Sequence, residues 1–255
     1  MRSKAVFAAS LLAVGVAFAG ETDLGTSATI GVMPLAISGT NVIINIPWVE
    51  AGSSGGGVAV SNLVKTAGLG AGDNLLWYSP SDAMYRIWRL TEHAGVLYWD
   101  AVSSITSIGE SKVASDSPAL QRGQALILNR QAATSTTIYI VGQYTSASAP
   151  SVTISPGYNL LAPPATSGST VLNNLSWTNA VDGVGAVNGD IIVTKDMTKY
   201  RWNGTNWVTT IYYPATLGFS ETSATITIPY GEGFWYHRDP KISTASFDLN
   251  WSTAQ

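Results

Sequence analysis

The chain has 255 residues, a formal net charge of −3, 11% charged residues, 45% hydrophobic residues and no cysteine. Charged residues make up about a quarter of an ordinary soluble domain, so Ser and Thr hydroxyls must supply much of this surface. The weak acidic balance excludes the basic patch that binding to nucleic acid or to anionic lipid requires. The lack of thiols excludes disulfides, thiolate catalysis and thiolate metal sites. The length allows one or two domains.

The N-terminus has the pattern of a secretory signal peptide. Arg2 and Lys4 precede an uncharged apolar run at 5–15, and Ala17-Phe18-Ala19 is a small-residue cleavage signature. The run is shorter than the ~20 apolar residues of a membrane-spanning helix. We therefore expect an exported protein, extracellular or on the cell surface, from which cleavage after Ala19 removes residues 1–19. We expect no membrane span in the mature chain.

The rest of the chain predicts strands almost throughout. Short β-branched or aliphatic runs, most of them bounded by Gly, Pro, Asn or Ser, predict strands at 42–46, 125–128, 138–141, 191–193 and 224–228. The segment from Tyr200 to Val208 predicts a hairpin whose loop contains Asn203-Gly204. Helical spacing is confined to Val60–Ala67 and Val171–Trp177, each long enough for about two turns.

Five sequence blocks recur in the same order in both halves, which predicts an internal duplication. They place Asp73 on Asp190 and Gly123 on Gly231, and they align Tyr85-Arg86-Ile87-Trp88 with Tyr200-Arg201-Trp202. We expect an all-β fold of two similar sandwich or barrel-like lobes, each with one short helix. The expected parts are an N-terminal arm at 20–33, a first lobe at 34–144, a small polar linker at 145–150 and a second lobe at 151–255.

The second half contains an Asn159-Leu160-Leu161 strand, Gly189-Asp190 before a strand, the aromatic hairpin and then Gly231-Glu232-Gly233-Phe234-Trp235. In this order the motifs resemble a group of duplicated secreted bacterial β-proteins without known function. The first half departs from the pattern, with Gln124-Ala125 in place of Glu-Gly. The resemblance implies export and paired β lobes. It implies no activity, and therefore no catalytic residue.

Patterns that support catalysis or metal binding are weak. Asp73 and Asp190 each follow a glycine and precede a strand, where an Asp that caps a turn through backbone amides explains the position without catalysis. Glu232 precedes an aromatic run, but its repeat equivalent is Gln124, which cannot ionise. The two histidines have no neighbours at metal-ligand spacing. We therefore expect a protein that is not an enzyme and needs no cofactor or metal.

The hairpin aromatics are the candidate binding residues. Strand alternation puts Tyr200 and Trp202 on one face, and a four-residue loop pairs Trp202 with Trp207 across the strands. Such a three-ring patch could stack a sugar, because the C–H faces of sugars are apolar. The same rings could instead cover the core of their own lobe, as aromatics do in small β-proteins. Their recurrence in both halves favours the core role.

Two functions remain as hypotheses. The leading one is an exported, non-enzymatic surface or extracellular structural protein that self-associates, with the arm at 20–33 as one route because it has no counterpart in the duplication. Thr29, Ile30 and Val32 lie in a strand-like stretch that can add to a sheet edge of its own lobe or of a neighbouring molecule. The alternative is a carbohydrate-binding or adhesive module that holds a polysaccharide with the hairpin aromatics.

Overall fold

The computed structural model describes residues 29–46, 64–102, 122–144, 151–164, 168–178, 185–213 and 218–251. The predicted signal peptide, the first part of the N-terminal arm and the predicted linker lie outside these ranges. The described chain consists of antiparallel strands and one three-residue 3-10 helix, so the all-β prediction is confirmed. Within these ranges no helix has the length and apolarity needed to cross a membrane.

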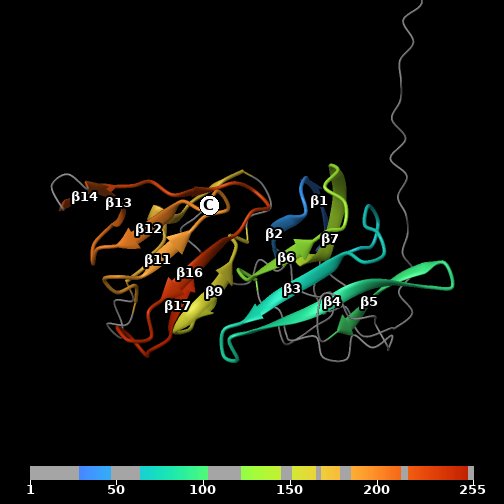
Figure 1. Cartoon of the computed structure of the whole chain (residues 1–255), viewed down its shortest axis with the longest axis horizontal. Helices are drawn as coiled ribbons and strands as arrows, with labels where there is room; N and C mark the ends of the chain where they lie inside the picture. Colours follow the sequence, from blue (N-terminus) through green and yellow to red (C-terminus); the bar gives the residue numbers. More distant parts are fainter. Residues whose placement is uncertain are drawn as a thin grey trace, which may run out of the picture.

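The first lobe is a five-stranded sheet with a two-stranded ribbon packed on it (Figure 1). The sheet order is β2-β6-β3-β4-β5, and the ribbon pairs β1 with β7. Their bounds are β1 Thr29–Ile37, β2 Asn41–Asn45, β3 Asn74–Ser79, β4 Met84–His93, β5 Val96–Val102, β6 Ala125–Asn129 and β7 Thr136–Tyr144. The buried core between them is mostly aliphatic, with Trp88 and Trp99 as its tryptophans.

The second lobe is a six-stranded sheet in the order β14-β13-β12-β11-β16-β9, with the ribbon β8–β17 and the short pair β10–β15 beside it. The bounds are β8 Ser151–Ile154, β9 Gly157–Leu161, β10 Thr170–Val171, η1 Leu172–Asn174, β11 Ile191–Val193, β12 Lys199–Trp202, β13 Trp207–Tyr213, β14 Gly218–Ser223, β15 Thr227–Ile228, β16 Phe234–Arg238 and β17 Phe247–Asn250. Its core is rich in aromatic rings, among them Trp177, Trp207, Phe234 and Tyr236.

The two lobes share one strand order, because β2-β6-β3-β4-β5 matches β9-β16-β11-β12-β13. Their turns match as well: Leu90 donates its N–H to the carbonyl of Asp73 at 2.7 Å, and Trp202 donates to that of Asp190 at 2.8 Å. In this register Trp88-Arg89-Leu90 of the first lobe is equivalent to Tyr200-Arg201-Trp202 of the second. The sequence alignment had matched Arg201 with Arg86, which lies three residues before Arg89. The register of a strand is set by its hydrogen-bonded partner and by which side chains are buried, so the local similarity of two Tyr-Arg pairs is not enough to predict it. The duplication itself stays a prediction.

The predicted helix in the first lobe is wrong where the structure describes it. Val64 is fully buried and pairs with Ile140 of β7 as an isolated bridge, and its carbonyl accepts the indole N–H of Trp99 at 2.9 Å. A β-branched residue that completes a sheet is better placed in extended backbone. In the second lobe the expected two-turn helix is only η1, three residues long.

The predicted N-terminal arm is partly described, and it lies in its own lobe. Thr29 and Ile30 begin β1, which pairs with β7 over its whole length. Val32 points outward and is 58% exposed, whereas Met33 enters the core. Pro34 lacks an N–H and cannot donate in a ladder, a feature that protects edge strands against further pairing. Of the two arrangements considered, the structure contains the in-lobe strand.

Close backbone packing joins the lobes where β9 meets β3 and β6 (Figure 1). Ala162 donates its N–H to the carbonyl of Gly123 at 3.0 Å, and Leu160 packs with Ala125 in a small shared core. A Cβ on Gly233 would lie 2.5 Å from the Ile43 methyl and 3.2 Å from the Ala125 Cβ of the first lobe, so a glycine at this position allows the lobes to approach closely. The outer faces of both sheets therefore contact each other at this corner.

Candidate functional site

The hairpin aromatics form as predicted but do not share an exposed face. Trp202 pairs with Trp207 across the loop, their ring centroids 5.2 Å apart. Both belong to the core of the second lobe, and their side chains are almost fully buried. Trp202 and Trp207 line one hollow together with Trp177, whereas Tyr200 packs on the edge of the same core and lines another hollow. The structure thus brings the two tryptophans together as a buried pair, with Tyr200 partly buried at the edge of the same core.

The turn aspartates cap their turns, as the sequence predicts. Asp73 accepts N–H bonds from Gly70 at 3.0 Å and from Gln131 at 2.8 Å. Asp190 accepts the N–H of Val187 at 3.0 Å. Each carboxylate replaces the solvent that the turn amides lose on burial, which explains why both precede a strand.

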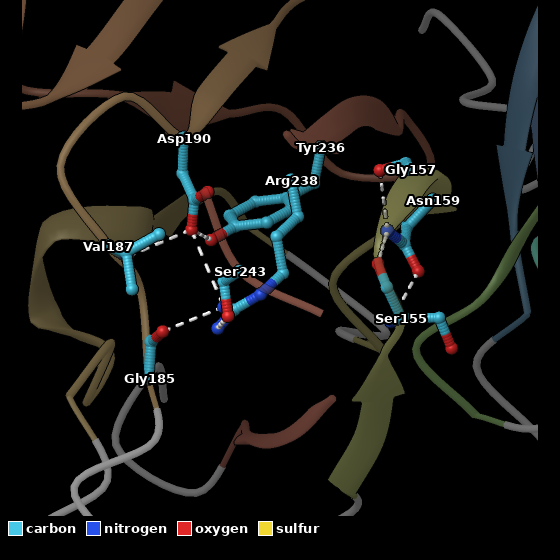
Figure 2. Close-up of polar contacts among 9 residues, drawn as sticks. All are labelled: Ser155, Gly157, Asn159, Gly185, Val187, Asp190, Tyr236, Arg238 and Ser243. Atoms are coloured by element: carbon cyan, nitrogen blue, oxygen red, sulfur yellow. Dashed lines mark hydrogen bonds and ion pairs between the residues drawn. The ribbon is translucent and has the colours of Figure 1, made fainter. Parts of the chain in front are cut away.

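Asp190 also belongs to a buried polar cluster with Tyr236 and Arg238 (Figure 2). The Tyr236 hydroxyl donates to its carboxylate at 2.5 Å, and an Arg238 nitrogen lies 3.5 Å away. Burial raises the pKa of Asp190, although the Tyr236, Val187 and Arg238 contacts oppose this. Burial also raises the pKa of Tyr236, and the nearby negative charge of Asp190 raises it further.

These groups are arranged for structure. All three side chains are essentially inaccessible to solvent, and none of them lines the inter-lobe hollow described below. Arg238 bonds the carbonyl of Gly185 and the hydroxyl of Ser243, each at 2.7 Å, so it ties the loop before β11 to the turn after β16. A buried acid without substrate access supports packing and turn geometry.

The exposed aromatics gather elsewhere, in a row that crosses the junction of the lobes. From the first lobe, Tyr85 contacts Tyr78 with ring centroids 5.3 Å apart. Tyr78 contacts Trp235 of β16 at 5.3 Å, and Trp235 contacts Tyr158 of β9 at 6.1 Å. The contacts are edge-to-face, with interplanar angles of 69°, 79° and 88°. Such contacts hold each ring in place before any ligand arrives.

Strand alternation explains why these rings face outward. In β16 the side chains of Phe234, Tyr236 and Arg238 enter the core, so Trp235 lies on the outer face. Tyr158 on the neighbouring strand is 51% exposed, and Tyr85 is 41% exposed. Exposed rings in contact with one another are typical of a binding surface, whereas isolated ones are ordinary.

The row lines an open hollow of about 420 Å³, which we call the inter-lobe hollow. Its walls are mostly apolar, and it is lined by Tyr78, Tyr85, Tyr158, Val193, Met197, Lys199 and Trp235. Volume and composition match those of small-ligand sites, which combine apolar walls with a few polar groups. Both lobes contribute, so the hollow exists only because the lobes meet in this arrangement.

The turn between β11 and β12 forms one rim of the inter-lobe hollow. Asp196 braces this turn by accepting the hydroxyls of Thr194 at 2.5 Å and Thr198 at 2.7 Å, and these bonds lower its pKa. Met197 has a φ of +64° and is 71% exposed. A non-glycine residue in this backbone region is strained, and such strain is common at ligand-binding sites. The turn therefore presents Met197 and the nearby Lys199 to the hollow in a defined position.

The hydroxyls of Tyr78 and Tyr85 stay neutral at physiological pH, because the pKa of each is raised from its ordinary value of 10.0. Burial raises the pKa of Tyr78 and of Tyr85, and the proximity of Tyr158 and Tyr78 respectively adds to the effect. Each hydroxyl can therefore both donate and accept a hydrogen bond.

This row was not predicted from the sequence, because its members come from three separate parts of the chain: the β3–β4 hairpin, β9 and β16. The Gly-Glu-Gly-Phe-Trp motif did contain Trp235, and β-strand alternation would have placed that ring opposite Phe234. Nothing in the sequence pairs it with Tyr78, because that contact depends on how the lobes meet.

The remaining candidate groups are paired or isolated. Glu232 forms an ion pair with Lys195 at 2.7 Å, and His93 bonds the buried carboxylate of Asp100 at 2.9 Å. In the part of the chain that the structure describes, no group of three His, Asp or Glu side chains is placed to hold a metal ion. Comparison with protein-family models, curated proteins and solved structures finds no match to this chain.

Proposed function

We propose that this protein is an exported, non-enzymatic binding module of the cell surface or extracellular matrix, which holds a carbohydrate in the inter-lobe hollow. One observation carries the proposal: four mutually braced aromatic rings line an open hollow, and two of them are about half exposed.

Carbohydrate fits this surface better than a fully apolar ligand does. The C–H faces of a pyranose stack on aromatic faces, and its hydroxyls need partners, which the Tyr78 and Tyr85 hydroxyls supply. Rings held by their neighbours lose little freedom when a ligand binds, which favours affinity. The hydroxyl-rich, charge-poor surface suits contact with hydrated polysaccharide.

Binding to a panel of polysaccharides, measured by isothermal titration, tests the proposal. Trp235→Ala should weaken binding about 30-fold, as expected for a central aromatic contact worth about 2 kcal/mol. Tyr139→Ala is the matched control, because Tyr139 on β7 is 39% exposed, much like Tyr85, and it neither lines the hollow nor belongs to the shared core between the lobes. Tyr158→Ala removes a half-exposed ring and keeps the test valid if Trp235→Ala alters the lobe junction. Unchanged affinity in both ring variants, or no binding to any polysaccharide, contradicts the proposal.

Export is tested separately. If the N-terminal segment is a signal peptide, mass spectrometry of secreted protein should find Gly20 as its first residue. Secreted protein that retains Met1 would contradict it.

Self-association is the second candidate function, and β14 favours it. Among the described strands it is the outermost of its sheet, and Phe219 on it is 69% exposed. An unpaired edge with exposed apolar side chains can add a strand from a second copy. Phe219→Lys should then abolish assemblies that light scattering detects for the wild-type protein. A wild-type protein that stays monomeric at high concentration contradicts this candidate and leaves carbohydrate binding unaffected.

A further inference from the structure

Lys199 is the one charged residue among those that line the inter-lobe hollow. It is exposed, and within the described residues its ammonium has no ion pair or hydrogen bond. Lys195, four residues earlier on the same turn, contrasts with it: its ammonium is 2.7 Å from the carboxylate of Glu232 and faces a different hollow. The turn therefore carries one paired lysine and one unpaired lysine, and the unpaired one lies at the aromatic surface.

The position of Lys199 relative to the rings follows from the sheet. Val193 pairs with Trp235 on one side and with Lys199 on the other. The three residues therefore lie in one row on the outer face, with Lys199 two strand spacings, or about 10 Å, from Trp235. A bound saccharide on Trp235 can extend along this row to the ammonium.

The charge decides which ligands suit the hollow. Perpendicular aromatic rings also attract cations, and a quaternary ammonium is the usual ligand of such a cage. Here the Lys199 ammonium repels a cation, and no carboxylate lines the hollow to offset this. A neutral ligand would cover part of an ammonium without replacing its hydration. A ligand whose apolar face stacks on the rings and that also carries an anionic group can pair with the Lys199 ammonium.

We infer that the ligand is an acidic carbohydrate, in which a uronic acid ring stacks on the aromatic row while a carboxylate pairs with Lys199. This inference rests on the proposed function and adds the ligand's chemical class. The pair is exposed, so its contribution is modest and is screened by salt.

The experiment uses oligomers of several uronic acids, each with its neutral methyl ester as the matched probe. The wild-type protein should bind at least one acid about two- to fivefold more tightly than its ester at low salt. At ~1 M salt, where the Debye length is about 3 Å, the preference should disappear. Lys199→Met should lose the preference, while Lys195→Met should keep it.

The inference is overturned if the wild-type protein binds acid and ester equally, if Lys199→Met retains the preference, or if no uronic acid oligomer binds. Failure of the proposed function has a different signature. In that case Trp235→Ala changes the affinity for neither acidic nor neutral polysaccharide. Tight binding of a neutral glycan that Trp235→Ala abolishes and Lys199→Met leaves intact would keep the proposed function and reject the acidic ligand.

Discussion

The two lobes share a strand order, yet equivalent positions have different chemistry. On the outer face of the first lobe, Asn41, Asn129 and Asn74 lie side by side on β2, β6 and β3, and their amides are joined by hydrogen bonds of 2.7 and 3.3 Å. The equivalent row in the second lobe is Tyr158, His237 and Ile191. One framework thus supports a closed polar row in one lobe and an aromatic surface in the other. Fold and site are therefore specified by different residues.

The buried arginines after β6 and at the end of β16 show the same contrast. Arg130 donates to the carbonyl of Thr134 at 2.7 Å, and Asp73 nearby is satisfied by backbone amides alone. Arg238 instead lies beside Asp190, so the second lobe contains a buried ion pair where the first keeps the two groups separate. A buried pair is sensitive to loss of one partner.

The largest expected effect is on these arginines. Arg238→Met should lower the free energy of unfolding by about 3–5 kcal/mol, because it leaves Asp190 buried without its cation. Arg130→Met should cost less, about 1–3 kcal/mol, since it removes hydrogen bonds to carbonyls only. Urea unfolding of both variants measures the difference. The double variant Asp190→Asn/Arg238→Met should recover part of the loss, and equal losses for the two arginine variants would contradict the contrast.

A smaller effect is expected at two equivalent glycines, each of which lies against the other lobe. A Cβ on Gly123, at φ +92°, would meet the rigid indole of Trp251, whereas one on Gly231, at φ +79°, would meet the flexible end of Leu35. Gly123→Ala should therefore cost about 2–4 kcal/mol and Gly231→Ala about 1–3 kcal/mol. Gly204→Ala is the control, because that position has φ +99° and open space around it. Thermal unfolding should rank the variants in this order. A larger loss of stability for Gly231→Ala than for Gly123→Ala would contradict the view that the Trp251 indole yields less than the Leu35 side chain.

The pH dependence of stability tests the buried carboxyl of the second lobe. The pKa of Asp190 is raised from its ordinary value of 3.8, so the folded state holds this proton at pH values where the unfolded state has released it. The stability from Asp190 is therefore complete below pH 3.8 and is lost as the pH rises through the raised value. The difference in unfolding free energy between wild type and Asp190→Asn should fall with rising pH over this interval. A difference that grows with pH would mean that Arg238 outweighs burial.

The smallest effect is expected in the amide row of the first lobe. Asn129→Ala removes its bonds to Asn41 and Asn74, each worth about 0.5–1.5 kcal/mol, and should leave carbohydrate binding unchanged. His237→Ala in the equivalent position removes the ring that contacts Tyr158 at 4.4 Å, and it should weaken binding about two- to threefold with little change in stability. Chemical unfolding and titration on the same two variants separate these outcomes.

Local signals in the sequence predicted part of the secondary structure. β-Branched and aliphatic runs predicted β2, β6, β7 and β11 and part of β15, and Asn203-Gly204 with its flanking tryptophans predicted the hairpin and its pairing. The capping role of Asp73 and Asp190 was also predictable, because an Asp after glycine satisfies backbone amides within a few residues. These interactions act over short separations, so the residues concerned are neighbours in the sequence.

The tertiary structure decided which aromatic rings are exposed. Alternation shows only that Trp202 on β12 and Trp235 on β16 each lie on one face of their own strand. Whether that face is core or surface depends on what packs against it: Trp202 is buried in the core of the second lobe, whereas Trp235 lines the inter-lobe hollow. The same reason explains the failed helix at Val64, where pairing with β7 outweighs local spacing. Contacts between residues that are distant in the sequence set burial, and burial separates a core tryptophan from one that can bind a ligand.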